Sequence, residues 1–204
     1  MTDATIDLVC WDFGDTLVDE TFMQLAPEGV PEWGAAYRAA FAADPTFAQS
    51  LDLGEASLCD LVDALALELP DTPRAVITRH LRTVWHRIEW FDEARSWIEG
   101  LNGHVLQAVV TVNPHEFHGI AVACGLDRLV DVIVTSADTV SLSKPVMARR
   151  ARRLLGLDEA LTTTLLIDNK IDNIDAFVVD GGQAILFDRN TINDELLSAL
   201  GAVT

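Results

Sequence analysis

Positive charge, cysteine and long apolar runs are all scarce in this chain. Lysine and arginine total 14 against 32 aspartate and glutamate residues, a formal net charge of −18. A surface this acidic repels nucleic acid and anionic membranes, which excludes both as general partners. No stretch approaches the roughly 18 consecutive apolar residues of a membrane span, and residues 1–5 show no secretory signal. We therefore expect a soluble, cytoplasmic protein.

Two scarce residue types narrow the chemistry further. The cysteines Cys10, Cys59 and Cys124 fit neither a disulfide framework nor the spacing of a zinc motif. Lys144 and Lys170 are the only lysines. A negatively charged substrate is still possible, but on so acidic a chain it needs a local positive site. Lys144 precedes a predicted helix and is a candidate for that site, whereas we interpret Lys170 as a surface residue.

The composition is that of a globular protein. Half of the 204 residues are hydrophobic and 23% are charged, which suffices for a sizeable core and rules out a disordered chain. The length fits one large domain, or one domain with an insertion.

Short apolar runs alternate with helical patterns over most of the chain, and this alternation predicts a parallel sheet with helices on both faces. The fold class is therefore α/β with a Rossmann-like core. Strands are predicted at residues 6–11, 105–111, 132–136, 164–168 and 184–187, and helices at 114–124, 146–155, 172–179 and 194–200.

The segment between the first and second predicted strands has a different hydrophobic pattern. From about residue 27 to residue 100 apolar residues recur at helical spacing, as in Leu58, Leu61, Val62, Leu65 and Leu69, and no convincing strand occurs. We interpret residues 18–98 as an inserted helical cap domain, and residues 1–17 with 99–204 as the α/β core domain.

Polar residues follow several of the predicted strands. Because the carboxyl ends of parallel strands lie along one edge of a sheet, these residues should converge although they are far apart in sequence. They are Asp12, Asp15, Thr16, Thr111, Asn113, Asp168 and Asn169, together with Lys144 just before a predicted helix.

In this pattern the chain resembles the haloacid dehalogenase superfamily of aspartate-nucleophile hydrolases, over residues 6–16 and 90–187. The run from Asp12 to Leu17 is similar to the family's first motif, usually Asp-x-Asp-Gly-Thr-Leu. Thr111 resembles the second-motif hydroxyl residue, and Lys144 with the following proline resembles the third motif. Residues 166–173 resemble the fourth motif in its Asp-Asp-x-x-x-Asn form, and the inserted segment resembles a helical cap.

The resemblance implies a phosphoryl-transfer site. Asp12 would be the nucleophile, forming an acyl-phosphate that divides one hard step into two easier ones. Thr111 and Lys144 would surround the transferred phosphoryl group with donors and positive charge, and Thr16 and Asn113 would contact the substrate. Mg²⁺, a hard cation that prefers oxygen ligands, would be bound by Asp12, the Gly14 carbonyl, Asp168 and Asn169.

Two positions depart from the family pattern. Gly14 stands where phosphatases of this family carry an Asp that serves as general acid and base, a role worth roughly 10²–10⁴-fold in rate. Asp15 follows it where Gly is usual, so a substitute catalytic role for Asp15 requires a shifted loop. Asn169 replaces the usual metal-binding carboxylate, although its amide oxygen can still ligate a metal.

We therefore predict a Mg²⁺-dependent hydrolase, most simply a phosphatase for a small phosphorylated metabolite. The alternative is a catalytically weak or inactive relative that binds a phosphorylated ligand or a protein partner. Carbon–halogen hydrolysis is disfavoured because that branch of the family usually carries an aromatic residue at position 14. Carbon–phosphorus hydrolysis is disfavoured because it uses a cap lysine, and residues 18–98 contain none.

Overall fold

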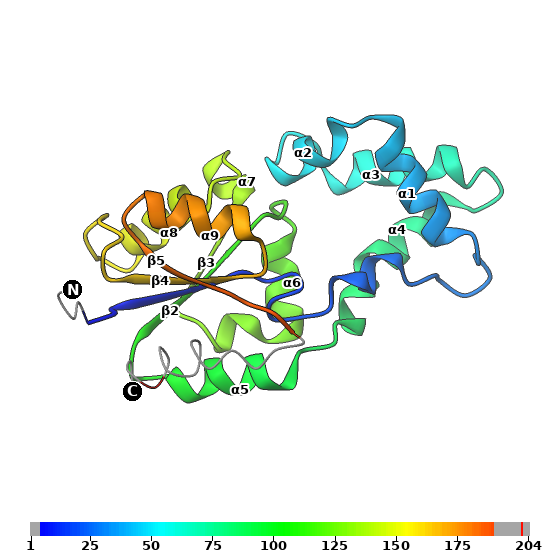
Figure 1. Ribbon diagram of the computed structural model, residues 1–204. Coiled ribbons are helices and arrows are strands. Elements are labelled where there is room, and N and C mark those ends of the chain that lie inside the picture. The colour runs from blue at the N-terminus through cyan, green and yellow to red at the C-terminus, as the bar shows by residue number, and fades with distance from the viewer. Residues whose placement is uncertain (1–4, 190–200, 202–204) are drawn as a thin grey trace.

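The computed structural model describes residues 5–189 and 201, and its centre is a five-stranded parallel sheet in the order β3-β2-β1-β4-β5 (Figure 1). The predicted α/β fold is thereby confirmed, with strand ends that differ from the prediction by at most two residues. The strands are β1 (Leu8–Trp11), β2 (Leu106–Thr111), β3 (Val132–Thr135), β4 (Thr164–Asp168) and β5 (Gln183–Leu186).

Helices cover both faces of this sheet because the central strands are apolar on both sides, as a buried parallel sheet requires. Along β1, Val9 and Trp11 join one buried cluster, and Leu8 and Cys10 join the other. The first cluster includes residues of α5 (Asp92–Leu101) and α6 (Phe117–Cys124), and the second includes residues of α8 (Lys144–Leu154) and α9 (Ile171–Val179). Figure 1 shows α8 and α9 on one side of the sheet and α5 on the other.

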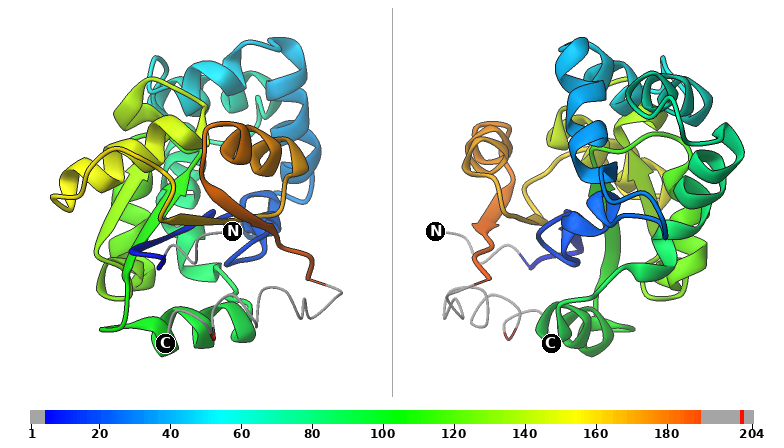
Figure 2. Two further views of the ribbon diagram at one scale, coloured as in Figure 1. Left: turned by 60° about the vertical axis from the view of Figure 1, so that its left-hand side comes forward. Right: turned by 90° about the vertical axis from the view of Figure 1, so that its right-hand side faces the viewer.

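The inserted segment is helical, as predicted, and has a buried cluster of its own that includes Trp33, Leu65, Ile77 and Leu81. Figure 2 shows these helices standing beside the carboxyl edge of the sheet. The exact division at residues 18 and 98 stays a prediction. The elements of this segment are η1 (Glu20–Gln24), α1 (Trp33–Ala43), α2 (Phe47–Asp52), α3 (Leu58–Glu68), α4 (Arg74–Thr83) and η2 (Val84–Arg87).

Three local features differ from the sequence-based expectation or lie beyond it. Lys144 is the first residue of α8 rather than a residue before the helix, and the proline after it is tolerated because the first turn needs no amide donor. Residues 126–128 and 136–139 form the short helices η3 (Leu126–Arg128) and α7 (Ser136–Thr139), which were not predicted. The predicted helix at 194–200 lies outside the described residues. Within the described ranges, no helix has both the length and the apolar character that crossing a membrane requires.

Candidate active site

A buried lysine between two buried carboxylates lies at the carboxyl edge of the sheet. Asp12 directly follows β1, Asp168 ends β4, and Lys144 begins α8. The Lys144 Nζ lies 2.5 Å from Asp12 Oδ1 and 3.3 Å from Asp168 Oδ2, and it donates to the Val110 carbonyl at 2.7 Å. All three charged residues are 6% exposed or less. The expected convergence of Asp12, Asp168 and Lys144 is therefore present in the structure.

Lys144 and Asp168 have opposite effects on the pKa of Asp12. Burial raises the pKa of the Asp12 carboxyl above its usual range, the Lys144 ammonium lowers it, and the nearby Asp168 carboxylate raises it again. Breaking such a buried pair is costly because it leaves one charge without a partner. Lys144 consequently fixes where the Asp12 carboxylate points.

Asp168 is bound from its own loop as well. Its Oδ1 accepts a hydrogen bond from the Lys170 amide at 2.8 Å, and its Oδ2 accepts one from Asn173 Nδ2 at 2.9 Å. Asp168 is fully buried, and both of its oxygens accept hydrogen bonds, while Oδ2 also lies 3.3 Å from the Lys144 ammonium. In this arrangement the carboxylate orients the lysine.

A small cavity opens in front of this cluster, and both lysines of the chain line it. Lys144 forms its buried wall, and Lys170, which is exposed as expected for a surface residue, also borders it. The position of Lys170 beside the cavity could not be predicted from the sequence, because its loop is held by the hydrogen bond from the Lys170 amide to Asp168. The full lining is Asp12, Gly14, Glu20, Thr111, Val112, Asn113, Lys144, Lys170 and Asn173.

Two polar residues that end or follow β2 are linked at the wall of this cavity. The Asn113 amide nitrogen Nδ2 donates to Thr111 Oγ1 at 2.8 Å, which leaves the Thr111 hydroxyl proton free to donate to a ligand. The Asn113 backbone amide donates to Ser136 Oγ at 2.9 Å, and the Ser136 hydroxyl also donates to the Asp52 carbonyl of the cap segment. Thr111 and Asn113 therefore both border the small cavity, and their contact with a substrate stays a prediction.

The loop after β1 places its other expected site residues differently. Asp15 has a left-handed backbone, φ 54°, which Asp tolerates better than most residues. Its Oδ1 accepts a hydrogen bond from the Glu20 amide at 3.1 Å, and its side chain borders a neighbouring hollow rather than the small cavity. Thr16 is 1% exposed, and its buried hydroxyl has no hydrogen-bond partner.

Glu20, the first residue of η1, was not singled out by the sequence analysis. A Cβ atom built on Gly14 would lie 2.8 Å from Glu20 Cδ and 2.9 Å from its Oε1. The Glu20 carboxylate therefore fills the space that a side chain at position 14 would need. Partial burial raises the pKa of Glu20 above its usual range, and the neighbouring Asp15 charge adds to this effect.

Of the expected metal ligands, Asn169 has a side-chain oxygen that no protein donor occupies. This Oδ1 atom is buried, which fits a hard cation that takes amide and carboxylate oxygens together with water and phosphate. In the described part of the chain, no group of three or more His, Cys, Asp or Glu side chains could hold a metal by itself. A metal here would therefore rely on a mixed donor set in which Asp12 supplies the charge.

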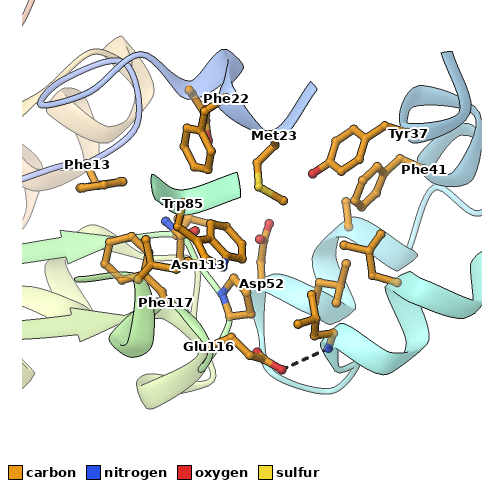
Figure 3. Close-up of a pocket in the computed structure, with 18 residues that line it drawn as sticks. Phe13, Phe22, Met23, Tyr37, Phe41, Asp52, Trp85, Asn113, Glu116 and Phe117 are labelled. Carbon is orange, nitrogen blue, oxygen red and sulfur yellow. Dashed lines mark hydrogen bonds between the residues drawn. The ribbon is translucent and has the colours of Figure 1, made fainter. Parts of the chain in front are cut away.

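A second cavity of about 320 Å³ adjoins the first and shares Glu20, Val112 and Asn113 with it. It lies between the cap segment and the core, and Figure 3 shows its aromatic walls. Burial raises the pKa of Asp52 in this cavity to about 6, and the nearby Glu20 charge contributes. The apolar side chains that line it are Phe13, Phe22, Met23, Tyr37, Phe41, Ala48, Leu51, Leu58, Leu61, Trp85, Val112, Pro114, Phe117 and Ile120.

The sheet and the inserted helices have the fold of solved haloacid dehalogenases and of enzymes described as members of the same family, which is the fold that the sequence motifs predict. Several solved structures are similar to this chain over most of its length. One is a family enzyme from Bacteroides thetaiotaomicron in complex with magnesium and inorganic phosphate, with TM-score 0.67, 10% identity, and coverage of 94% of this chain and 98% of that chain. Searches with family sequence patterns and against curated proteins returned no match.

Two further solved structures are similar to a comparable degree. A predicted family hydrolase from Porphyromonas gingivalis has TM-score 0.66 and 14% identity, with 97% of this chain and 98% of that chain covered. The L-2-haloacid dehalogenase from Xanthobacter autotrophicus with covalently bound chloropropionic acid has TM-score 0.62 and 14% identity, with 95% and 83% covered. At these identities the likeness establishes the fold, and the reaction has to be argued from the site.

The pKa of Asp52 leads to a prediction about stability. Its folded pKa of about 6 exceeds the unfolded value of about 3.9, so the folded state binds the proton more tightly. The stability contributed by that proton is fully present below the unfolded pKa and is lost as the pH rises through about 6. Asp52→Asn should therefore raise the melting temperature, and by more at pH 7.5 than at pH 5.

Thermal unfolding of the wild type, Asp52→Asn and the exposed control Asp71→Asn at both pH values tests this. The control should show no such pH-dependent gain. An Asp52→Asn variant whose melting temperature differs from wild type equally at the two pH values would contradict the assignment.

Proposed function

We propose that the protein is a Mg²⁺-dependent phosphatase that hydrolyses a small phosphate monoester through an aspartyl-phosphate on Asp12. One observation carries this proposal. In a chain with a net charge of −18 and two lysines, both lysines line one small cavity beside the Asp12 carboxylate. The two lysines offset the Asp12 and Glu20 carboxylates of the same cavity, so an anionic substrate meets less repulsion there than over the rest of this acidic chain.

The side chains around this cavity have distinct tasks in the proposed reaction. Asp12 attacks phosphorus, and its carboxylate is oriented for attack by the hydrogen bond from Lys144. Lys144 and Lys170 balance the negative charge of the phosphoryl oxygens, and the Thr111 hydroxyl donates to one of them. Because these donors are fixed before substrate binds, little reorganisation is needed in the transition state.

Magnesium is proposed as the cofactor. The oxygens that would hold it are those of Asp12 and the unpartnered Asn169 Oδ1. When bound, the ion would offset phosphoryl charge and keep the carboxylates of this acidic site from repelling the substrate. The structurally similar enzyme from Bacteroides thetaiotaomicron, crystallised with magnesium and inorganic phosphate, supports this choice.

The adjoining cavity suggests an apolar leaving group. Its walls are mainly aromatic and aliphatic, and its volume of about 320 Å³ lies within the range of small-molecule sites. Its acidic members, Glu20, Asp52 and Glu116, disfavour a second anionic group on the substrate. We therefore propose a monoester of an apolar, uncharged or cationic alcohol or phenol, rather than a sugar phosphate.

The competing reaction for the same nucleophile is displacement of halide from carbon. The similarity to a haloacid dehalogenase raises this alternative, but two lysines facing a cavity favour the doubly charged phosphoryl group. A ligand-binding protein without catalysis is the remaining alternative, and the paired Asp12 and Lys144 argue against it. Assays for released phosphate and for released chloride distinguish the three.

Replacing the nucleophile tests the reaction itself. Asp12→Asn preserves shape, and Lys144 keeps Asp168 as a partner at 3.3 Å, so the fold should persist. The amide cannot attack phosphorus, and turnover of 4-nitrophenyl phosphate should fall by about 10³-fold or more. The exposed control Asp71→Asn should retain full activity. Equal activity in wild type and Asp12→Asn, with matched melting temperatures, would reject Asp12 as nucleophile.

Binding of inorganic phosphate tests the cation sites without turnover. Calorimetric titration should show affinity at least about tenfold higher with Mg²⁺ than without it, because the ion offsets charge at the anion. Lys170→Met should weaken binding by about three- to tenfold, whereas Arg128→Met, which removes one exposed charge near the amino edge of the sheet, should not. Asn169→Ala should reduce the effect of Mg²⁺. Affinity that is indifferent to Mg²⁺ would reject the metal.

The leaving-group cavity is tested by comparing substrates. The wild type should show a kcat/KM at least about tenfold higher for 1-naphthyl phosphate than for a hexose phosphate, because the ring buries apolar surface. Phe41→Ala should raise the KM for the naphthyl ester and leave inhibition by inorganic phosphate unchanged. A preference for the hexose phosphate would overturn the proposed substrate class.

A further inference from the structure

The proposed hydrolysis needs a proton donor for the leaving oxygen, and the position two residues after the nucleophile is Gly14, which has none. Four titratable side chains line the small cavity in the described part of the chain, those of Asp12, Glu20, Lys144 and Lys170. Asp12 and Lys144 are paired with each other, and Lys170 is a cation that suits phosphoryl oxygens. The other carboxyl among the described lining residues belongs to Glu20.

Glu20 lies where that proton is required. It lines both the small charged cavity and the larger apolar cavity. The phosphoryl group would occupy the first and the organic group the second, so the ester oxygen that joins them would lie at their junction. The carboxylate also fills the space beside Gly14, where a Cβ would be only 2.8 Å from Glu20 Cδ.

The neighbouring residues hold Glu20 at this junction. Asp15 Oδ1 accepts a hydrogen bond from the Glu20 amide at 3.1 Å. Asp19 is the N-cap of η1, and its Oδ1 accepts a hydrogen bond from the Thr21 amide at 2.9 Å. The backbone of Glu20 is thus fixed from both sides, while its side chain keeps contact with solvent, from which a proton can be replaced.

We infer that Glu20 is the general acid and base of the proposed phosphatase, replacing a side chain at position 14. In the first step an Asp12 oxygen bonds to phosphorus, the bond from phosphorus to the leaving oxygen breaks, and Glu20 gives its proton to that oxygen. In the second step Glu20 takes a proton from water as the water oxygen bonds to phosphorus. The electron pair of the broken aspartyl–phosphorus bond returns to Asp12, and inorganic phosphate is released.

This inference rests on the proposed function, and leaving-group dependence tests it. 4-Nitrophenyl phosphate releases a stable phenolate, whereas 4-nitrobenzyl phosphate has nearly the same shape but releases a basic alkoxide. Glu20→Gln should lower kcat/KM for the benzyl ester by about 10²-fold or more and for the phenyl ester by less than about tenfold, because kcat/KM reports the first step. The kcat of both esters should fall, since the second step also loses its base. Glu32→Gln, an exposed control in the same segment, should match wild type.

A relocated carboxylate provides the rescue. Gly14→Asp alone should lower activity, because its Cβ would crowd Glu20. The double variant Gly14→Asp/Glu20→Ala should have a kcat/KM for the benzyl ester at least about tenfold higher than that of Glu20→Ala. If both esters are hydrolysed in an Asp12-dependent way but the ratio of their kcat/KM values in Glu20→Gln equals that of the wild type, the role of Glu20 is overturned and the proposed function stands. A wild type with no Asp12-dependent turnover of either ester would overturn the proposed function together with this role.

Discussion

The buried ion pair between Lys144 and Asp12 is the constraint on which the rest of the site depends. An ammonium that is 2% exposed has to be paired, and its two carboxylates come from adjacent strands. That pairing is possible only if β1 and β4 are neighbours and α8 begins at the carboxyl edge of the sheet, which the strand order β3-β2-β1-β4-β5 provides. Fold and site are therefore specified by the same contact between residues 132 positions apart.

Charge is distributed unevenly around this pair, and the two adjoining cavities differ in the kind of group they can bind. The small cavity contains both lysines of an acidic chain beside the Asp12 and Glu20 carboxyls, and the adjoining cavity contains mostly apolar side chains with three carboxyls and no lysine. One half suits a phosphoryl group, and the other suits an uncharged or cationic organic group. Glu20 and Asn113 border both halves, and through Ser136 the Asn113 amide is connected to the Asp52 carbonyl of the cap segment.

The sheet and its functional edge could be predicted because they depend on strong local signals. Apolar runs with polar residues at their ends predict β1, β2 and β4, and parallel pairing alone brings Asp12, Thr111 and Asp168 to one edge. Glu20 and Lys170 could not be recognised, because their direction depends on hydrogen bonds made after the chain has folded, to Asp15 and Asp168 respectively. The short helix α7 was missed because it is only one turn long and begins from a capping box at the end of β3.

The order Gly14-Asp15, in place of the Asp-Gly order of the motif that this loop resembles, then has a single physical explanation. A side chain at position 14 would approach the Glu20 carboxylate to within about 3 Å, so Gly14 leaves room for that carboxylate beside the cavity. The left-handed turn usually made by Gly is made here by Asp15, whose φ is 54° and whose carboxylate holds the Glu20 amide. Taken separately, each substitution suggests a weakened enzyme. Together, the glycine makes room for a carboxylate and the aspartate positions it, so the loop keeps an acid beside Asp12 by a different route.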